Sequence, residues 1–313
     1  MKKLLNTLYV STQGVYLNRE GETVVASIDR VQKMRLPIHT LSSIVCFGNV
    51  MCSPFLLGLC GERGIKVSFL TENGRFLARV SGPVSGNVLL RREQIRRADN
   101  PEATLLLARN FVIGKIANCR TVLQRAARDH GATDQLTTAI AILANVLRRI
   151  TTADNIDVLR GFEGEAANIY FGAFNNMVVA QCDTFSMEAR SRRPPLDPLN
   201  ALLSFLYTIL AHDCSAALEG VGLDPQVGFL HALRPGRPSL ALDLMEEFRP
   251  ILADRVVLSL INRQQITAKG FKTSESGAVV MDDDTRKTVL RVWQEKKQET
   301  LTHPFINEKA EIG

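Results

Sequence analysis

The hydrophobic periodicity of this chain changes near residue 82, and this change constrains the fold more than any other feature. Before it, short apolar or β-branched runs such as residues 44–47 and 65–70 alternate with turn-forming residues, which is typical of β-strands. Beyond it, apolar residues recur about every 3.6 positions, as in amphipathic helices. We therefore predict an α+β fold of two domains, a small β-rich N-terminal domain at residues 1–82 and a larger all-α domain at residues 83–313, joined at segment 81–86.

Capping and turn signals locate several elements. Asn73-Gly74 is a hairpin-turn sequence, and a returning strand at residues 75–80 follows it. Ser53-Pro54 is typical of a helix N-terminus, because serine caps free backbone N–H groups and proline fits the first helical position. Helical spacing predicts long helices at residues 101–129, 133–148, 155–172, 198–219 and 253–265, and a shorter one at 239–248.

The composition argues against several classes of protein. The six cysteines form no C-x-x-C pair, which disfavours a zinc site or a disulfide framework and favours reduced thiols in the cytoplasm. The N-terminus lacks a signal-peptide core, and the longest apolar stretch, residues 199–210, is too short for a membrane helix and is predicted to be a buried one. The motifs of P-loop, dinucleotide-binding, H-E-x-x-H and G-x-S-x-G enzymes do not occur. We expect a cytoplasmic protein without a membrane partner.

Positive charge is concentrated in one segment. The net charge is +6, and residues 89–128 alone hold nine Lys or Arg against three Asp or Glu, an excess equal to the whole net charge. A solvated helix face would account for this excess, and so would a surface that binds phosphates. The residues that we associate with DNA binding are Arg91, Arg92, Arg96, Arg97 and Lys115, with Arg192 and Arg193 of a proline-containing loop.

Residues 159–171 hold a carboxylate between glycines. Gly161 and Gly164 flank Glu163; each glycine costs a helix about 1 kcal/mol relative to alanine but lets another backbone or a DNA strand approach. Tyr170 lies two helical turns after Glu163 on the same face. Glu163 is either an exposed helix carboxylate or part of a site.

Residues 222–231 end in a histidine. Asp224-Pro225 is a turn signal, and Gly228 allows the chain to pass close to another segment. His231 follows two large apolar residues. It is either a hydrogen-bonded core residue or a ligand.

Residues 240–250 place three carboxylates on one helix. Asp243, Glu246 and Glu247 form an acidic patch beside an apolar stripe. Their mutual repulsion would be relieved by a bound cation, although a solvated acidic face is the alternative. Carboxylates bind Mg²⁺ or Mn²⁺, and an imidazole shifts the preference towards Mn²⁺. Such a cation would serve phosphodiester cleavage by polarising the phosphate.

These three segments, in this order after a β-rich domain, resemble the CRISPR-associated spacer-acquisition endonuclease/integrase family (CRISPR-associated protein one). The matching motifs are residues 159–171, 222–231 and 243–250, supported by residues 192–205, and residues 85–92 are similar to the subtype that accompanies type I-C systems. The resemblance implies a metal-dependent DNA endonuclease/integrase that inserts protospacer DNA into the CRISPR array during adaptation. Its reactions would be phosphodiester hydrolysis and transesterification, with a 3′-hydroxyl attacking a repeat-boundary phosphodiester.

The resemblance also implies the residues of the site. The catalytic and metal-binding residues for Mg²⁺ or Mn²⁺ would be Glu163, His231 and Glu246. The residues that support them would be Asp243, Glu247 and Tyr170.

The resemblance implies partners as well. The N-terminal domain would mediate a homodimer, and two dimers would flank a dimer of the small CRISPR-associated protein two in a heterohexameric complex on protospacer and repeat DNA. Relatives of this subtype continue past residues 303–305 into a further basic helical stretch, whereas this chain ends at Gly313, so we expect a truncated form or a natural variant.

Two alternatives stay open from the residues. A catalytically silent DNA-binding or scaffold protein would need no metal. A general metal-dependent nuclease or Holliday-junction processor would hydrolyse branched DNA without strand transfer and without the small partner. The sequence does not separate an integrase from a nuclease, because water and a DNA 3′-hydroxyl would use the same metal site.

Overall fold

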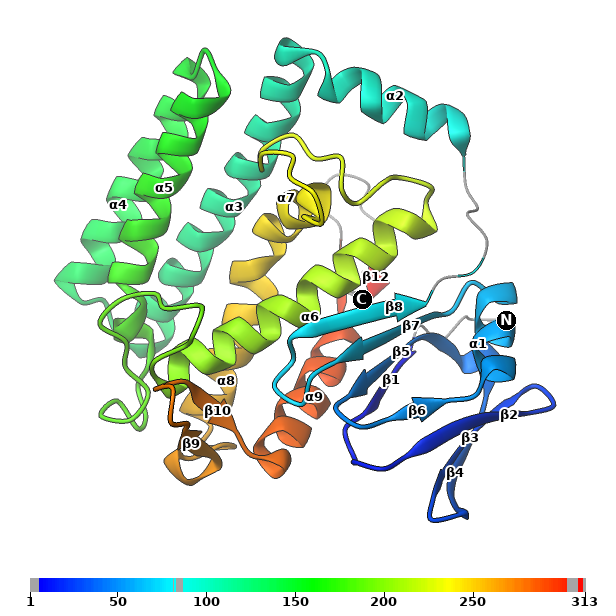
Figure 1. Cartoon of the computed structure of the whole chain (residues 1–313). Helices are drawn as coiled ribbons and strands as arrows, with labels where there is room; N and C mark the ends of the chain where they lie inside the picture. The colour runs from blue at the N-terminus through cyan, green and yellow to red at the C-terminus, as the bar shows by residue number, and fades with distance from the viewer. Residues whose placement is uncertain (1–5, 81, 83–86, 303–308, 312–313) are drawn as a thin grey trace. The chain divides into compact units, whose positions relative to one another are not determined.

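The computed structural model divides into two compact units, Met1–Ser85 with Asp283–Gly313, and Gly86–Asp282 (Figure 1). The predicted order, a small β-rich region followed by a larger and mainly helical one, is confirmed. The C-terminal segment belongs to the β-rich unit, which differs from the predicted helical domain at residues 83–313. All but one residue of the predicted boundary 81–86 lies outside the described residues, which are 6–80, 82, 87–302 and 309–311.

The β-rich unit contains two four-stranded sheets. The strands of the first, in spatial order, are β1 (Asn6–Val10), β5 (Leu41–Phe47), β7 (Lys66–Leu70) and β8 (Phe76–Val80). The first three are parallel, and β8 returns antiparallel through the predicted turn, where Gly74 has a φ of +84°. The strands of the second sheet are β4 (Val31–Pro37), β3 (Thr23–Ile28), β2 (Tyr16–Glu20) and β6 (Met51–Cys52).

Helix α1 (Pro54–Glu62) packs against strands of both sheets. Its predicted N-terminus is confirmed, because the hydroxyl of Ser53 accepts a hydrogen bond from the backbone N–H of Leu56 at 3.2 Å. The core of the unit is apolar and closed to solvent, and includes Leu17, Ile44, Leu56 and Val67. This burial stabilises the sheets without any disulfide.

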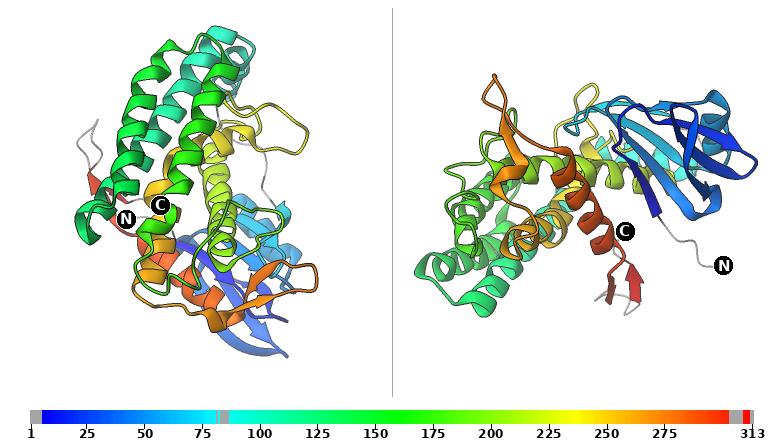
Figure 2. Two further views of the ribbon diagram at one scale, coloured as in Figure 1. Left: turned by 90° about the vertical axis from the view of Figure 1, so that its left-hand side faces the viewer. Right: turned by 90° about the horizontal axis from the view of Figure 1, so that it is seen from below.

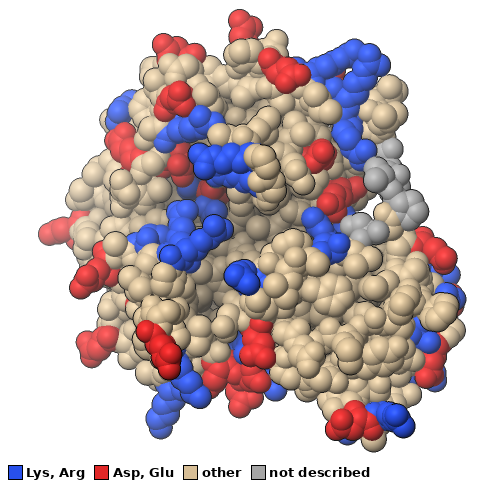
Figure 3. Space-filling view, viewed as in Figure 1, with Lys and Arg blue, Asp and Glu red and all other residues tan. Residues whose placement is uncertain are grey.

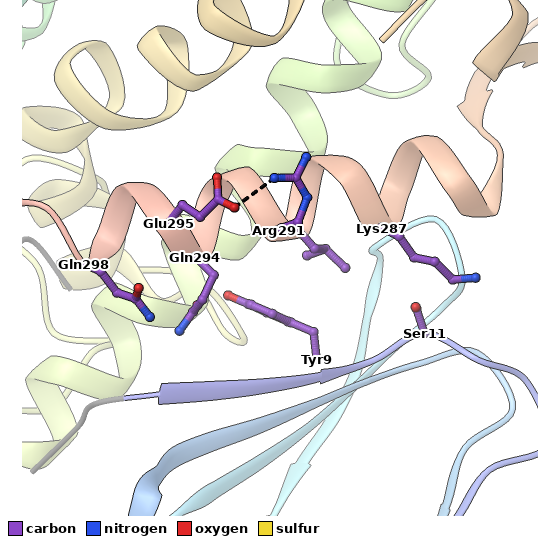
Figure 4. A pocket seen from close by; sticks show the side chains of 8 residues that line it. Tyr9, Ser11, Lys287, Arg291, Gln294, Glu295 and Gln298 are labelled. Carbon is purple, nitrogen blue, oxygen red and sulfur yellow. Dashed lines mark hydrogen bonds and ion pairs between the residues drawn. The ribbon is translucent and has the colours of Figure 1, made fainter. Parts of the chain in front are cut away.

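Helix α9 (Asp283–Lys297) completes the β-rich unit and was not predicted, because charged residues leave it only a narrow apolar stripe. Its Trp293 is fully buried, and the helix packs against β1, an edge strand of the first sheet. A hollow of about 350 Å³ lies between them, lined by Tyr9 and Ser11 on one side and by Arg291 and Gln294 of α9 on the other (Figure 4). The helix therefore lies beside a strand that has a hydrogen-bonded neighbour on one side only. The short pair β11 (Thr300–Thr302) and β12 (Lys309–Glu311) follows it.

The second unit is built on seven α-helices among the described residues. They are α2 (Val88–Ala98), α3 (Pro101–His130), α4 (Asp134–Arg149), α5 (Ile156–Gly172), α6 (Pro198–Gly220), α7 (Ser239–Phe248) and α8 (Arg255–Asn262). All six predicted helices are confirmed, but α8 is shorter than predicted, because a π-helical turn, η4 (Arg249–Asp254), takes its first two residues and the helix ends at Asn262. Helix α2 was not predicted. The antiparallel strands β9 (Phe271–Thr273) and β10 (Val279–Met281) make the unit not entirely helical. The 3₁₀ turns of this unit are η2 (Ile150–Thr152), η3 (Phe174–Met177) and η5 (Ala268–Gly270), and the β-rich unit contains η1 (Ile38–Thr40).

Helix α3 is the centre of this unit. It packs against α4, α5 and α7 and against η4, and Figure 2 shows α3, α4 and α5 running side by side. By length and composition alone helix α6 could cross a membrane, but 61% of its most apolar stretch is buried inside the protein. With Leu199, Leu202 and Leu206 fully buried, α6 is a core helix, as predicted.

Candidate metal centre

Three predicted site residues lie on three different segments of the helical unit. Glu163 is in the middle of α5, Glu246 is on α7, and His231 is in the loop between α6 and α7. Helix α3 packs against both α5 and α7 and carries Lys115, whose ammonium forms ion pairs with both Glu163 and Glu246. The distance from Lys115 Nζ to Glu246 Oε2 is 2.7 Å. The structure therefore brings Glu163 and Glu246 together at Lys115 of α3.

The imidazole of His231 is held by Asp243. His231 Nδ1 lies 2.7 Å from Asp243 Oδ1, and the His231 backbone N–H donates to the same oxygen at 2.9 Å. Asp243 Oδ2 accepts from the backbone N–H groups of Phe229 and Leu230. When Asp243 is ionised and the ring is neutral, the carboxylate can only accept, so the ring proton is on Nδ1 and Nε2 keeps its lone pair. His231 Nε2 lies 3.8 Å from Glu246 Oε1.

Gly228 allows this arrangement. A Cβ atom at this position would lie 2.6 Å from the carbonyl carbon of Ser239 and 2.8 Å from Asp243 Oδ2. The carbonyl of Pro225 also accepts a hydrogen bond from the Leu240 N–H at 2.9 Å. The loop therefore lies directly on the first turn of α7, and the predicted close passage at Gly228 is confirmed.

Glu246 is a buried carboxylate in a positive environment. Its exposed fraction is 2%, and Arg249 NH1 lies 2.6 Å from its Oε1. Burial alone would raise the pKa of Glu246, but the charges of Arg249 and Lys115 outweigh this and lower it to about 2. The carboxylate is therefore ionised at neutral pH. Burial likewise opposes the charge of Lys115, but Glu246 and Glu163 raise its pKa above the ordinary value, so the side chain is an ammonium.

The predicted supporting residues behave differently from one another. Asp243 contacts His231 directly. The Tyr170 hydroxyl instead donates to the buried carboxylate of Asp254 at 2.9 Å. The side chain of Glu247 packs on Gly114, and its backbone carbonyl accepts from Asn118. Of the three, only Asp243 is hydrogen-bonded to one of the three candidate ligands.

Asp254 is the centre of a second buried polar cluster. Its Oδ1 accepts from the Tyr207 hydroxyl at 2.7 Å and its Oδ2 from Tyr170. Burial raises the pKa of Asp254 to about 6, although both hydroxyls and the nearby Arg249 favour the charged form. The guanidinium of Arg249 lies over the Tyr207 ring at 4.8 Å and pairs with Glu246, so it links the two clusters.

The prediction that Lys115 contacts DNA is corrected by its position. Its exposed fraction is 6% and its ammonium is paired with two carboxylates, so it is not part of an exposed basic surface. Helical spacing along α3 places Lys115 on the buried face and Arg120, Arg125 and Arg128 on other faces. Counting the charges of the segment does not reveal this difference.

The other predicted basic residues lie at the surface. Arg92, Arg96 and Arg97 of α2 are exposed, with Arg97 paired to Glu93, and Figure 3 shows Lys and Arg side chains gathered over α2. Arg91 on the same helix is partly exposed. Arg192 and Arg193 are exposed in the loop before α6.

Helix α2 is fixed to the loop that carries His231. Gln94, on its buried side, donates to the carbonyls of Asp224 and Val227 at 2.7 Å each and accepts from the Asp224 N–H at 2.8 Å. On a helix, Arg92 and Arg96 point away from Gln94. Gln94 therefore ties helix α2, with its basic face, to the loop of His231, a link that sequence reasoning missed.

Glu163, Glu246 and the Nε2 atom of His231 are the groups that could hold a metal. As they lie here, no three His, Cys, Asp or Glu side chains among the described residues converge closely enough to enclose an ion. The space between the two glutamates is taken by the ammonium of Lys115. The Lys115 ammonium therefore already supplies a positive charge between the two carboxylates.

Comparisons with known proteins agree with the motifs. The family model described as CRISPR associated protein Cas1 matches residues 8–295. The CRISPR-associated endonuclease Cas1 1 of Chlorobaculum tepidum is 57% identical over 316 residues, covering 100% of this chain and 92% of that protein.

Two solved structures share the fold. A casposase bound to an integration product has a TM-score of 0.85 at 22% identity, over 98% of this chain and 86% of its own. A chain of a Cas6-RT-Cas1–Cas2 complex has a TM-score of 0.80 at 24% identity, over 96% of this chain and 33% of its own. Because the family model spans nearly the whole chain and the Chlorobaculum protein is more than half identical to it, the chain belongs to the Cas1 family, as the three linked motifs predicted.

Proposed function

We propose that this Cas1-family chain is a metal-dependent DNA endonuclease and integrase that inserts protospacer DNA into the CRISPR array. One observation carries the proposal: Glu163 and Glu246, from two different helices, pair with one buried ammonium, and His231 Nε2 of a third segment lies 3.8 Å from Glu246. The relative from C. tepidum is named an endonuclease, and the casposase of the same fold is bound to an integration product, which supports strand transfer as well as cleavage.

Mg²⁺ or Mn²⁺ fits this set of donors. Neighbouring ligands of one such cation, each about 2.1 Å from it, lie roughly 3 Å apart, so His231 Nε2 and Glu246 Oε1, which are 3.8 Å apart, would have to move slightly closer to share it. Glu246 is kept ionised by Arg249 and Lys115. When bound, the cation would polarise the scissile phosphate and help to ionise the attacking hydroxyl.

The chain's own residues orient this site. Asp243 fixes the imidazole so that the lone pair of His231 Nε2 is on the side of Glu246, and its hydrogen bonds to three successive N–H groups keep the loop in place. Carboxylates that hold a metal-binding histidine in this way commonly change metal affinity 10- to 100-fold when they are removed. Arg249 adds a fixed positive charge beside Glu246.

The exposed arginines are proposed to bind DNA phosphates without reading sequence. They lie on α2 and in the loop before α6, and α2 is tied by Gln94 to the loop of His231. Contacts to phosphates position DNA but carry no sequence information. The residues concerned are Arg91, Arg92, Arg96, Arg97, Arg192 and Arg193.

The proposed assembly follows the family. The β-rich unit would mediate a homodimer, and two dimers would flank a dimer of the small CRISPR-associated protein Cas2. The solved Cas6-RT-Cas1–Cas2 complex, one chain of which shares this fold, supports a Cas2 partner. We place this assembly in the cytoplasm, where the array resides.

A strand-transfer assay tests the proposal. Labelled protospacer duplex and a supercoiled plasmid carrying the repeat are incubated with Mn²⁺, with and without the cognate small partner. Wild type is compared with Glu163→Gln and with the matched control Glu165→Gln, a residue of the same helix whose carboxylate pairs with Arg149 instead. We expect joining that requires metal and Glu163 and is unaffected by the control.

The other outcomes identify the alternatives. Nicking without joining, also in the presence of the small partner, would indicate a metal-dependent nuclease. DNA binding without any chemistry would indicate a scaffold protein. Either result would overturn the integrase proposal.

A further inference from the structure

Lys115 is a charged residue in an apolar environment. It lies in the middle of α3, between the buried residues Val112, Ile116 and Cys119, and its exposed fraction is 6%. Removing an ammonium from water is unfavourable unless an opposite charge compensates it. Here two carboxylates do so, one from α5 and one from α7.

The two carboxylates share Lys115 as their common cation. Glu163 and Glu246 come from different helices and would repel each other if nothing stood between them. Arg249 lies against Oε1 of Glu246, whereas Lys115 lies against Oε2. Among the ion pairs of the described residues, Lys115 is the cation that contacts both glutamates.

The contact to Glu246 is an ion pair in which the ammonium lies 2.7 Å from the buried carboxylate oxygen Oε2. A lysine ammonium is a compact charge on a flexible four-carbon stem, so it can leave this position without any movement of α3. These are the properties of an exchangeable cation.

We propose that Lys115 is the resident counter-ion of the metal site, which holds Glu163 and Glu246 together in the metal-free protein and must leave them when the metal binds. The inference rests on the proposed metal site. Metal binding is then an exchange of one cation for another. Lys115 keeps the site assembled, and it also makes the intrinsic metal affinity weaker than the same three ligands would provide without it.

The substitution Lys115→Met removes the charge and keeps the length of the side chain. In the metal-free protein the two glutamates lose their shared cation, so we expect the melting temperature to fall by roughly 4–10 °C. Mn²⁺ no longer has to displace an ammonium, so we expect it to bind roughly tenfold more tightly or better and to raise the melting temperature more than in wild type. The matched control is Lys269→Met, an exposed lysine of the same unit, which should change neither quantity.

The measurements are isothermal titration of the full-length protein with MnCl₂ and thermal unfolding with and without Mn²⁺. Tighter Mn²⁺ binding together with a less stable metal-free protein supports the inference. Unchanged or weaker binding in Lys115→Met, while wild type binds Mn²⁺ and Glu163→Gln does not, would overturn it and leave the proposed metal site standing. No Mn²⁺ binding by wild type would refute the metal site itself.

A second variant covers the case in which Lys115→Met does not fold. The double variant Lys115→Met/Glu163→Gln removes one of the two repelling charges, so its metal-free melting temperature should recover at least half of the loss. Folding of the double variant where the single one fails supports the counter-ion role. Equal failure of both would mean that Lys115 serves packing, and the inference would be wrong.

Discussion

Asp243 accepts two hydrogen bonds from His231, one from the backbone N–H at 2.9 Å and one from Nδ1 of the ring at 2.7 Å. The same carboxylate, which is fully buried, also accepts from the N–H groups of Phe229 and Leu230. One side chain of α7 therefore determines both the path of the loop and the protonation pattern of the ring.

This relationship predicts the effect of Asp243→Asn. An amide has only one accepting oxygen, so its nitrogen would face either the N–H groups of Phe229 and Leu230 or those of His231 that now donate to a carboxylate. We expect Mn²⁺ affinity to fall about 10- to 100-fold, measured by calorimetry. Glu247→Gln, on the same helix but turned towards Gly114, is the control and should stay within about twofold of wild type. Equal affinities for Asp243→Asn and wild type would contradict the role given to Asp243.

Substitution of the candidate ligands should impair strand transfer without impairing DNA binding. We expect His231→Ala and Glu246→Gln to reduce strand transfer more than roughly a hundredfold, because a direct ligand matters at least as much as the residue that orients it. Their affinity for DNA should stay within about twofold, since phosphate contacts dominate binding. Filter binding of the same labelled duplex checks this. A large loss of DNA affinity in both variants would point to a structural role.

The basic face of α2 should be visible in the salt dependence of DNA binding. Each lost phosphate contact lowers the slope of log K against log salt by about 0.9. We expect Arg92→Gln/Arg96→Gln to weaken binding and to reduce the slope by about 2. Arg125→Gln, near the other end of α3, removes a charge that is already paired with Asp129 and serves as the control. An unchanged slope in the double variant would mean that α2 does not contact phosphate.

Asp254 should give the protein a measurable pH dependence of stability. The pKa of its carboxyl is raised from 3.8 to about 6 by burial. The folded state therefore binds this proton more tightly than the unfolded state, so the contribution to stability is present at low pH and is lost as pH rises from about 4 to about 6. In Asp254→Asn this loss disappears. The free energy of unfolding of wild type should fall relative to the variant by up to roughly 3 kcal/mol over that range, and a difference that does not vary with pH would contradict the assignment.

Two glycines should respond to alanine in opposite directions. Alanine at Gly228 would place a methyl group 2.6 Å from the backbone of Ser239, so we expect a loss of about 1–3 kcal/mol in unfolding free energy and weaker Mn²⁺ binding. Nothing lies within 4 Å of a Cβ at Gly161 of α5, so Gly161→Ala should gain about 0.5–1 kcal/mol. Thermal unfolding distinguishes the two. If Gly161→Ala also weakens DNA binding, a DNA strand passes close to this glycine.

Local sequence patterns predicted where the helices and strands of this protein lie better than they predicted which of them contact one another. Apolar spacing and caps located α3 to α7 to within one residue at each end, since these signals are contained in neighbouring residues. Helix α2 was missed because its exposed apolar side chains, Val88, Leu89 and Ile95, form no single stripe. The extent of the β-rich unit was missed because α9 joins it from the far end of the chain.

In the candidate site too, residues within local motifs were predicted, whereas contacts between distant parts of the chain were not. The three motifs predicted Glu163, His231 and Glu246. The ion pair between Arg249 and Glu246 could also have been predicted, because the two residues are three positions apart. Lys115 could not be assigned, since its partners are 48 and 131 positions away and only the packing of α3 brings them to it. The type I-C assignment, which rests on residues 85–92, stays a prediction.

The groups of the site are distributed over most of the helical unit, from α3 through α5 to the loop and α7. During synthesis on the ribosome, α3 and α5 emerge with Lys115 and Glu163 already able to pair, long before Glu246 has been made. A nascent chain therefore carries neither the histidine nor the second glutamate, and cannot assemble the site until α7 has left the exit tunnel and docked.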